Sequence, residues 1–416
     1  MVIYNKEMKI MKKLIFTTMA ISALFLSVSC QKENVNDAPK GKGVVFTAYV
    51  DGVDPVDPDT KTVIGKNDEG KAVSLWNGKE RIWVLNGKEG DSSWKKAYEA
   101  TVSTPATKAD FKQETKDELT GDAFYAIYPC SASNYAAWTG GSESVTGITL
   151  KAEQTPVVDT YDPSTHIAVA YTTAGNYSLA FKNAVSYFKL TVGSDNVSEI
   201  CIFGNASEKI TGAFSLKYTP GEGEVAPTVE TSEGTLSYVK IISTEANPIV
   251  KGKTYYIAVL PTDFTTGFSV EMVAGGLKST CKTTTNQYKM TRNKIVDLGL
   301  IEYPTKTVYL YPGPWTADKA VLSVYYYIED TKVGGWADFA DADAYGRCEA
   351  QIPVYATHCH YIRSNPKFKH TWEDSGDIGD KVWNRYNNIK LSESNCLTVA
   401  VAANGSWYYN VSNYPK

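Results

Sequence analysis

The chain is dominated by short runs in which apolar, β-branched or aromatic residues alternate with polar ones, and turn residues bound each run. A two-residue period places alternate side chains on opposite faces of a strand. Pairs such as Asn77-Gly78 and Asn86-Gly87 separate the runs. No long run has the period of an amphipathic helix, so the pattern predicts an all-β protein of sandwich domains rather than a βαβ fold. The clearest predicted strands are residues 44–50, 123–128, 187–192, 255–260 and 321–328.

Composition narrows the class of protein further. The 416 residues are 43% hydrophobic, which is enough apolar surface for packed cores. At roughly 100–200 residues per domain, this length predicts two or three domains. A net charge of −4 and a pI of about 5.8 argue against a nucleic-acid binder with a basic surface. Only four histidines stand against 28 tyrosines and nine tryptophans, which suits a protein that presents aromatic surface.

The N-terminal segment has the layout of an exported protein. Two lysines precede an apolar run over residues 14–28, and small residues then lead into Cys30. This pattern resembles a bacterial lipoprotein signal over residues 1–29, with lipidation of Cys30 and a polar tether over residues 30–42. An ordinary signal peptide with an incidental cysteine is the alternative. Removing residues 1–29 takes away four lysines and one glutamate, so the net charge changes from −4 to −7.

The location follows from the same segment. No other apolar run approaches the roughly 20 residues that a membrane-spanning helix needs. We therefore expect a lipid-anchored protein of the cell outer membrane that is exposed at the cell surface.

Six further cysteines follow the predicted signal. Export permits disulfides, but six cysteines can pair in many ways, so the sequence assigns none. No Cys-x-x-Cys pair occurs, and structural zinc is therefore not expected. These residues are Cys130, Cys201, Cys281, Cys348, Cys359 and Cys396.

Turn-rich stretches divide the remaining chain into three predicted domains, residues 43–174, 175–303 and 304–416. The first boundary falls in residues 170–178 (AYTTAGNYS) and the second in residues 303–306 (YPTK). Five of the nine tryptophans lie after the second boundary, so composition changes there.

A series of short motifs runs through the first two predicted domains. They are Lys61-Thr62, Leu75–Val84 (LWNGKERIWV), Phe124–Pro129 (FYAIYP), Lys253–Pro261 (KTYYIAVLP) and Arg292-Asn293-Lys294. Together with the lipoprotein signal, this series resembles the fimbrillin family of Gram-negative surface and pilus lipoproteins. The resemblance covers about residues 43–300.

The fimbrillin resemblance implies two tandem β-sandwich domains of transthyretin-like topology. In some fimbrillins a protease removes an N-terminal segment, and a donor strand from another subunit fills the groove that remains. This chain departs from the family at Lys79-Glu80, where Asp is common, and it has no obvious Arg cleavage site near the first strand. Trp76 and Trp83 are expected to pack in a core or a turn.

The last predicted domain carries its own series of aromatic and polar motifs. They are Val308–Trp315 (VYLYPGPW), Val324–Tyr327 (VYYY), Gly335–Phe339 (GWADF), a strand at 348–354, His360–Pro366 (HYIRSNP) and Asp380–Asn384 (DKVWN). Their order resembles carbohydrate-binding modules of the starch-binding type. The resemblance implies a smaller β-sandwich with an aromatic platform, on which the C–H face of a sugar packs while polar groups contact its hydroxyls.

The candidate ligand-binding residues follow from that resemblance. Alternation along a strand puts Tyr325 and Tyr327 on one face and Tyr326 on the other, so these cannot all line one site. For each aromatic residue the alternative is packing in a small core, and for each polar residue it is a place in a turn. The platform candidates are Tyr325, Tyr327 and Trp336, then Trp315, Trp372 and Trp383, and the candidates for hydroxyl contacts are Arg363, Asn365 and Asn384.

Two patterns resemble metal sites but complete none. Residues 341–346 (DADAYG) begin like a calcium loop, but Tyr345 stands where another oxygen ligand would be needed, so we expect a polar turn. His358 and His360 would share one side of a strand with His370 nearby, but no carboxylate ligand can be placed. We expect no metal and no cofactor.

The chain has no GxSxG, HExxH, P-loop or GxGxxG motif in a suitable context, so we expect no enzyme. The leading hypothesis is a non-catalytic surface lipoprotein of fimbrillin type that acts in adhesion, with its last domain binding a glycan or host surface receptor. The alternative is a structural tip or anchor subunit, joined to other pilus subunits by donor-strand exchange, that binds no glycan. A secreted enzyme is a third possibility. No nucleic-acid partner is expected.

Overall fold

The structure is a computed structural model that describes residues 44–50, 64–66, 72–78, 80–86, 95–113, 119–131, 134, 144–217, 227–370 and 381–414. Within these residues the bounded elements are thirty β-strands and three short 3-10 helices, which confirms the predicted all-β class. The predicted signal, Cys30 and the tether all lie outside the described residues. Among the described residues, the structure has no helix long and apolar enough to cross a membrane.

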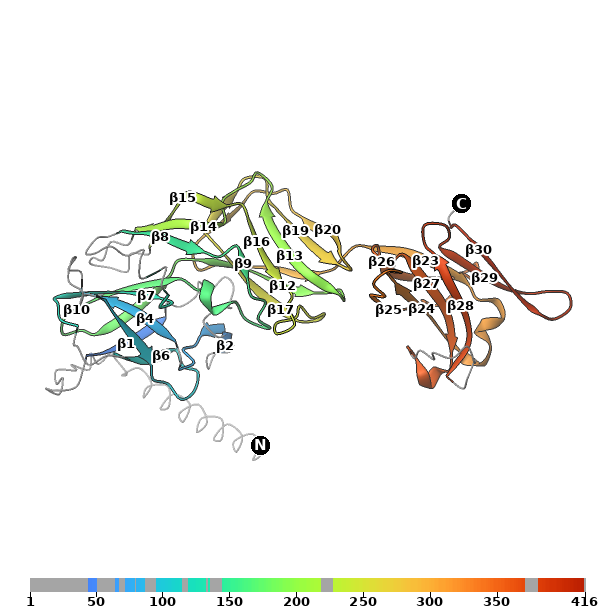
Figure 1. The fold of residues 1–416 in the computed structure, drawn as a ribbon, viewed down its shortest axis with the longest axis horizontal. Coiled ribbons are helices and arrows are strands. Elements are labelled where there is room, and N and C mark those ends of the chain that lie inside the picture. The colour runs from blue at the N-terminus through green and yellow to red at the C-terminus, as the bar shows by residue number, and fades with distance from the viewer. Residues whose placement is uncertain are drawn as a thin grey trace, which may run out of the picture. The chain divides into compact units, whose positions relative to one another are not determined.

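Seven strands close into a barrel that forms the first domain (Figure 1). The strand order is β1-β11-β10-β7-β4-β5-β6, and a parallel pairing of β1 with β11 completes the ring. The sequence predicted a two-sheet sandwich here, so this expectation is corrected to a barrel. The strands are β1 (Val45–Val50), β4 (Arg81–Leu85), β5 (Lys95–Ala100), β6 (Lys108–Gln113), β7 (Ala123–Tyr128), β10 (Ala168–Thr173) and β11 (Ser178–Asn183), beside a hairpin of β2 (Ile64–Lys66) and β3 (Ala72–Ser74).

The core of the barrel contains Trp76, which is 1% exposed. Its indole lies edge-on to Phe111, Tyr128 and Phe181, with ring centroids 4.9, 5.5 and 5.7 Å away. In the turn that follows, the Glu80 carboxylate accepts hydrogen bonds of 2.8 Å from the backbone N–H groups of residues 77 and 78. Glu80 therefore closes this turn through its carboxylate, although the family commonly has Asp here.

The chain crosses between the first two domains more than once. The strands β8 (Ser144–Leu150) and β9 (Glu153–Gln154) pair with β14 (Thr211–Lys217) and β16 (Tyr238–Ile242) of the second domain. The chain then passes through a 3-10 helix, η1 (Pro163–Thr165), and returns to supply β10 and β11 to the barrel. The predicted boundary between residues 174 and 175 is therefore corrected, because β11 belongs to the first domain and β8 to the second.

The second domain is built from several small sheets. β12 pairs with β17 and β22, and a five-stranded sheet has the order β20-β19-β13-β16-β9. A three-stranded sheet, β15-β14-β8, and the pair β18-β21 complete it. The remaining strands are β12 (Ser186–Val192), β13 (Val197–Gly204), β15 (Thr228–Leu236), β17 (Thr254–Val259), β18 (Thr262–Phe264), β19 (Phe268–Ala274), β20 (Leu277–Thr283), β21 (Tyr288–Met290) and β22 (Ile295–Ile301).

One hydrophobic core joins the barrel to the second domain. Ile127 and Val169 of the barrel strands pack in the same buried cluster as Ile148 of β8 and Phe214 of β14. This shared core explains why the chain can interleave the two domains, because strands of both cover the same apolar side chains.

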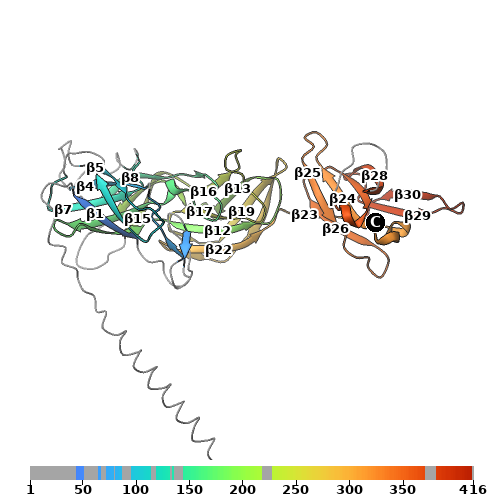
Figure 2. The same ribbon diagram turned by 90° about the horizontal axis from the view of Figure 1, so that it is seen from below.

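Two four-stranded sheets form the last domain, after β22 ends at Ile301. Their orders are β26-β23-β29-β30 and β25-β24-β27-β28, and β29 and β30 extend as a hairpin beyond the other strands (Figure 1, Figure 2). The elements are β23 (Thr305–Tyr311), η2 (Gly313–Lys319), β24 (Val321–Tyr327), β25 (Gly334–Asp338), β26 (Cys348–Pro353), β27 (His358–Ser364), η3 (Pro366–Phe368), β28 (Val382–Lys390), β29 (Cys396–Val401) and β30 (Trp407–Ser412).

Alternate side chains of β24 and β27 fill the core of the last domain. Val324 and Tyr326 of β24, and Cys359 and Tyr361 of β27, are at most 4% exposed and belong to one buried cluster. The residues between them in each strand therefore point to the outer face of the sheet. This outer face carries the candidate site.

Candidate functional site

The outer face of the sheet β25-β24-β27-β28 carries a row of aromatic rings. Trp336 of β25 lies opposite Tyr325 of β24, which lies opposite His360 of β27. The Tyr325 ring is 5.1 Å from that of Trp336, tilted by 60°, and 6.2 Å from that of His360, nearly parallel at 7°. We call the outward residues Trp336, Tyr325, Tyr327, His358 and His360 the aromatic face.

A second row lies beside the first, toward the β24–β25 turn. Gly334 faces Tyr327, so no side chain from β25 covers the tyrosine ring there. The Tyr327 ring is stacked with Tyr325 at 6.0 Å and with His360 at 4.9 Å, and the Lys332 ammonium lies 5.3 Å from its centroid. These neighbours leave Tyr327 only 6% exposed. As a ligand contact, Tyr327 is therefore corrected to a buried neighbour that stacks beside Tyr325.

A bulge in β28 fixes His360. Residues 387 and 388 together face His360, and Asn388 has a left-handed φ of 56°. The backbone N–H of Asn388 donates to His360 Nδ1 at 2.9 Å, and the Tyr327 hydroxyl donates to Asn388 Oδ1 at 3.0 Å. Because Nδ1 accepts a hydrogen bond, the ring is neutral with its proton on Nε2.

Electrostatics favour the same neutral form. Burial, and then the positive charges of Arg385, His358 and Lys332, lower the pKa of His360 to about 4.

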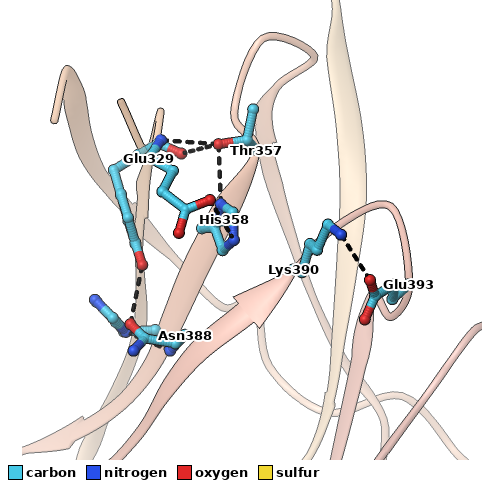
Figure 3. Close-up of polar contacts among 8 residues, drawn as sticks. Glu329, Thr357, His358, Asn388, Lys390 and Glu393 are labelled. Carbon is cyan, nitrogen blue, oxygen red and sulfur yellow. Dashed lines mark hydrogen bonds and ion pairs between the residues drawn. The ribbon is translucent and has the colours of Figure 1, made fainter. Parts of the chain in front are cut away.

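His358 belongs to a polar cluster at the end of the second row (Figure 3). Its Nε2 lies 3.3 Å from a carboxylate oxygen of Glu329, and its Nδ1 lies 3.0 Å from the Thr357 hydroxyl. That hydroxyl also accepts from the Glu329 backbone N–H at 3.0 Å. On the neighbouring strand, Lys390 pairs with Glu393 at 2.7 Å. The first three contacts tie the segment at Glu329 to the start of β27.

A charged group borders Trp336 on the other side. Asp338, two residues further along β25, accepts from Lys369 at 2.5 Å and lies 2.7 Å from His370 Nε2. Burial would raise the pKa of Asp338, but hydrogen bonds from Lys369 and His370 hold it below its usual value. The His370 ring stacks on the indole at 5.4 Å and 19°. One face of Trp336 is therefore already occupied.

Two of the predicted ligand contacts are core or scaffold residues. Trp315 is 0% exposed in the core of the domain, so its ring cannot meet a ligand. Arg363 is 5% exposed and donates to the carbonyls of Trp315 and Ala317, at 2.9 and 2.8 Å, and to Asp318 at 3.0 Å. Both predictions are corrected, because these residues hold η2 against the sheet.

The other candidates are not part of the aromatic face. Trp383 is the extra residue at a second bulge of β28, and the Arg363 guanidinium stacks 4.7 Å from its ring. Asn384 accepts from Arg363 at 3.3 Å. Asn365 caps η3 by accepting from the Lys367 N–H at 3.0 Å, so it is a turn residue. Trp372 lies outside the described residues.

The stretch 341–346 forms a closed turn. A carboxylate oxygen of Asp343 accepts from the backbone N–H groups of Tyr345 and Arg347, at 2.8 and 3.0 Å. Its other oxygen pairs with the Arg347 guanidinium at 3.0 Å. Within the described residues, no group of three His, Cys, Asp or Glu side chains is placed to hold a metal ion.

Sequence reasoning missed the supporting role of His360, Asn388 and His370. The Tyr-x-Tyr of β24 and the His-x-His of β27 share the two-residue period of a strand. This period was the signal in the sequence that the two residues of each pair lie on the same face of the sheet. The bulge that brings Asn388 under His360 had no such signal, because it depends on strand pairing.

Comparison with known proteins finds distant structural likenesses. No family model and no curated protein matches the chain. A proposed cell adhesion protein from Bacteroides ovatus matches with a TM-score of 0.37 and 13% identity, over 62% of this chain and 92% of that one. One from Bacteroides uniformis matches with a TM-score of 0.34 and 11% identity, over 91% and 100%.

The tip fimbrial protein Mfa3 of Porphyromonas gingivalis, truncated at its C-terminus, matches with a TM-score of 0.26 and 8% identity, over 61% of this chain and 94% of that one. TM-scores and identities this low assign neither a fold nor a function to the chain.

Proposed function

We propose that this chain is a non-catalytic cell-surface adhesion protein of fimbrillin type, whose last domain binds a glycan on the aromatic face. The fimbrillin part rests on the ordered sequence motifs. The glycan part rests on one observation, which is that the tilted rings of Trp336 and Tyr325 lie side by side, partly exposed, on the outer face of a sheet.

The two rings suit a sugar for a physical reason. They are tilted by 60°, so they form a corner with two apolar walls. A pyranose ring presents C–H groups that pack on aromatic carbon and hydroxyls that need polar partners. Lys369 and Asp338 supply such groups near Trp336. The Tyr327 and His360 rings stack beside Tyr325 on the same face, so the corner is preorganised.

Glycan arrays and affinity electrophoresis of the purified chain test the proposal. We expect Tyr325→Ala and Trp336→Ala each to lower affinity by about three- to tenfold, the loss that one aromatic contact typically produces. Tyr345→Ala is the matched control, because Tyr345 is 86% exposed in the turn at 341–346 and lies outside the aromatic face. If no glycan is retained, or if all three variants behave alike, the glycan role is wrong.

A structural pilus subunit is the second candidate, and one observation favours it. The strand β30 is the edge of its sheet and exposes Trp407, Tyr408 and Val411, with Val401 exposed on β29. Exposed apolar edge strands are common sites of pairing with another chain. Immunogold electron microscopy of surface filaments separates the candidates, since an adhesion protein with no pilus role would be absent from filaments.

The lipid anchor is part of the proposal. The sequence pattern before Cys30 supports it, and metabolic labelling with a fatty acid tests it. A Cys30→Ser chain should take up no label and should leave the membrane fraction.

A further inference from the structure

The strand β30 is an open edge of the last domain. It pairs with β29 on one side, and among the described strands none pairs with its other side. Its exposed apolar side chains are Trp407, Tyr408 and Val411, which are 39%, 51% and 38% exposed. An edge of this kind leaves a row of backbone N–H and C=O groups that can pair with another strand.

The hairpin turn shows which backbone groups of β30 face outward. The Ala402 N–H donates to the Ser406 carbonyl at 2.7 Å, so these two residues are hydrogen-bonded across the hairpin. Hydrogen-bonded and non-hydrogen-bonded pairs alternate along an antiparallel ladder, so even-numbered residues of β30 turn their N–H and C=O groups toward β29. The groups of Trp407, Tyr409 and Val411 therefore point away from β29.

The inner face of the hairpin continues past the core of its own domain. Val399 lies opposite Tyr409, and Val401 lies opposite Trp407. Val399 is 2% exposed in the core, whereas Val401 is 52% exposed, because the hairpin extends beyond the other strands (Figure 1). The end of the hairpin thus presents an apolar face beside an open backbone edge.

The hairpin is also free of charge. Between Glu393 and Lys416 the sequence has no Asp, Glu, Lys, Arg or His. The other edge strands of this domain carry charges, at Asp338 of β25, Glu349 of β26 and Arg385 of β28. Charged residues on an edge oppose its pairing with other strands, and β30 lacks this protection. A second copy of β30 would bring no like charges together, which favours pairing of this strand with itself.

We propose that the last domain forms a two-fold dimer, in which β30 pairs antiparallel with β30 of a second copy. With the axis at Tyr409, the outward backbone groups of the two strands face each other, and Trp407 of each copy lies opposite Val411 of the other. Such aromatic–aliphatic pairs stabilise neighbouring strands. A two-fold contact uses the same surface on both copies, so association stops at two. The dimer is independent of the proposed glycan function, because the aromatic face belongs to the other sheet.

The exposed area sets the strength of this dimer. A whole aromatic side chain has an area of about 150–250 Å², so the exposed parts of Trp407, Tyr408 and Val411 amount to roughly 300 Å² per copy. Stable interfaces bury about 800 Å² per partner. We therefore expect a reversible dimer, with a dissociation constant on the order of 100 μM.

Sedimentation equilibrium between about 5 and 500 μM tests the dimer. The Cys30→Ser chain is used, because it has no lipidation site. Trp407→Glu and Val411→Lys should each weaken dimerisation roughly tenfold, since each places an unpaired charge in an apolar contact. An equimolar mixture of the two variants should recover it, because the new carboxylate of one copy then faces the new ammonium of the other.

Val354→Lys is the matched control, an exposed valine of the same domain that lies outside β30 and should leave dimerisation unchanged. Circular dichroism of each variant shows whether it is folded. A chain that stays monomeric at the highest concentration overturns the inference, as does a dimer that neither substitution weakens. Growth beyond two copies, or a mixture that recovers no dimer, overturns the two-fold pairing.

Glycan binding is measured separately, so either proposal can fail without the other.

Discussion

At the scale of single residues, the structure separates side chains that look alike in the sequence. Trp315 and Trp336 are both tryptophans in the motifs of the last domain, yet one is 0% exposed and the other lines the outer face. Arg363 is likewise a residue type that often contacts ligands, but in the structure it is buried and holds η2 through hydrogen bonds. The difference lies in which strand or helix each side chain meets, and neighbouring sequence does not encode it.

Arg363 is predicted to contribute strongly to stability. Arg363→Met removes four hydrogen bonds and leaves the buried carbonyl of Trp315 without its Arg363 donor, so we expect a loss of about 3 kcal/mol in the free energy of unfolding. Urea unfolding followed by tryptophan fluorescence measures it. The control Lys367→Met changes an exposed residue of η3 and should cost less than about 0.5 kcal/mol. Equal stability of both variants would contradict the scaffold role.

His360 predicts a pH dependence of the last domain. Its pKa in the folded protein is about 4, against an ordinary value of 6.5, so in between only the unfolded chain takes up the proton. Its contribution to stability is thus fully present above a pH of 6.5 and declines as the pH falls toward 4. Thermal unfolding between these pH values should show that the melting temperature depends less steeply on pH in His360→Gln than in the natural chain. Identical slopes would mean that the histidine is not held neutral.

At the scale of elements, pairing partners decide what each strand belongs to. β11 was assigned by sequence to the second domain because a turn-rich stretch precedes it. In the structure it closes the barrel between β1 and β10. The bulge in β28 is a second example, since one extra residue turns Asn388 toward His360. Local sequence predicted that these segments are strands but not which strands they pair with.

The place of β11 in the barrel is testable through Phe181. This side chain is 0% exposed and contacts the Trp76 ring, so Phe181→Ala should leave a cavity and cost about 3–5 kcal/mol. Leu300→Ala is the control, because Leu300 is 58% exposed and its truncation should change the free energy of unfolding little. Chemical unfolding of the two variants, with fluorescence from the barrel tryptophans, gives the comparison. A small effect at Phe181 would place β11 outside the barrel core.

At the scale of the whole molecule, burial controls the chemistry of the cysteines. The six cysteines of the described residues form no disulfide. In the last domain, Cys348 lies opposite Leu310 and Cys396 opposite Tyr309. Adjacent positions of one strand point to opposite faces, so these two sulfur atoms lie on different sides of the sheet. Burial also raises the pKa of Cys201 to about 11.

We predict that these cysteines are protected thiols. In the folded chain, iodoacetamide at pH 8 should label Cys348, Cys359 and Cys396 at least tenfold more slowly than in urea, because each is at most 3% exposed and burial raises its pKa. Peptide mass spectrometry measures the labelling. Disulfide-linked peptides from the folded chain would contradict the prediction.

The sequence by itself determined the all-β class and the positions of many strands, such as β7 at Ala123–Tyr128, because a two-residue period is a local property of a strand. It also placed Tyr325 and Tyr327 on one face for the same reason. Tertiary structure alone decided that the first domain is a closed barrel, that its strands interleave with the second domain, and that Trp315 and Arg363 are internal. These features depend on pairing between residues far apart in the chain, and the side-chain period of a strand carries no information about its partner.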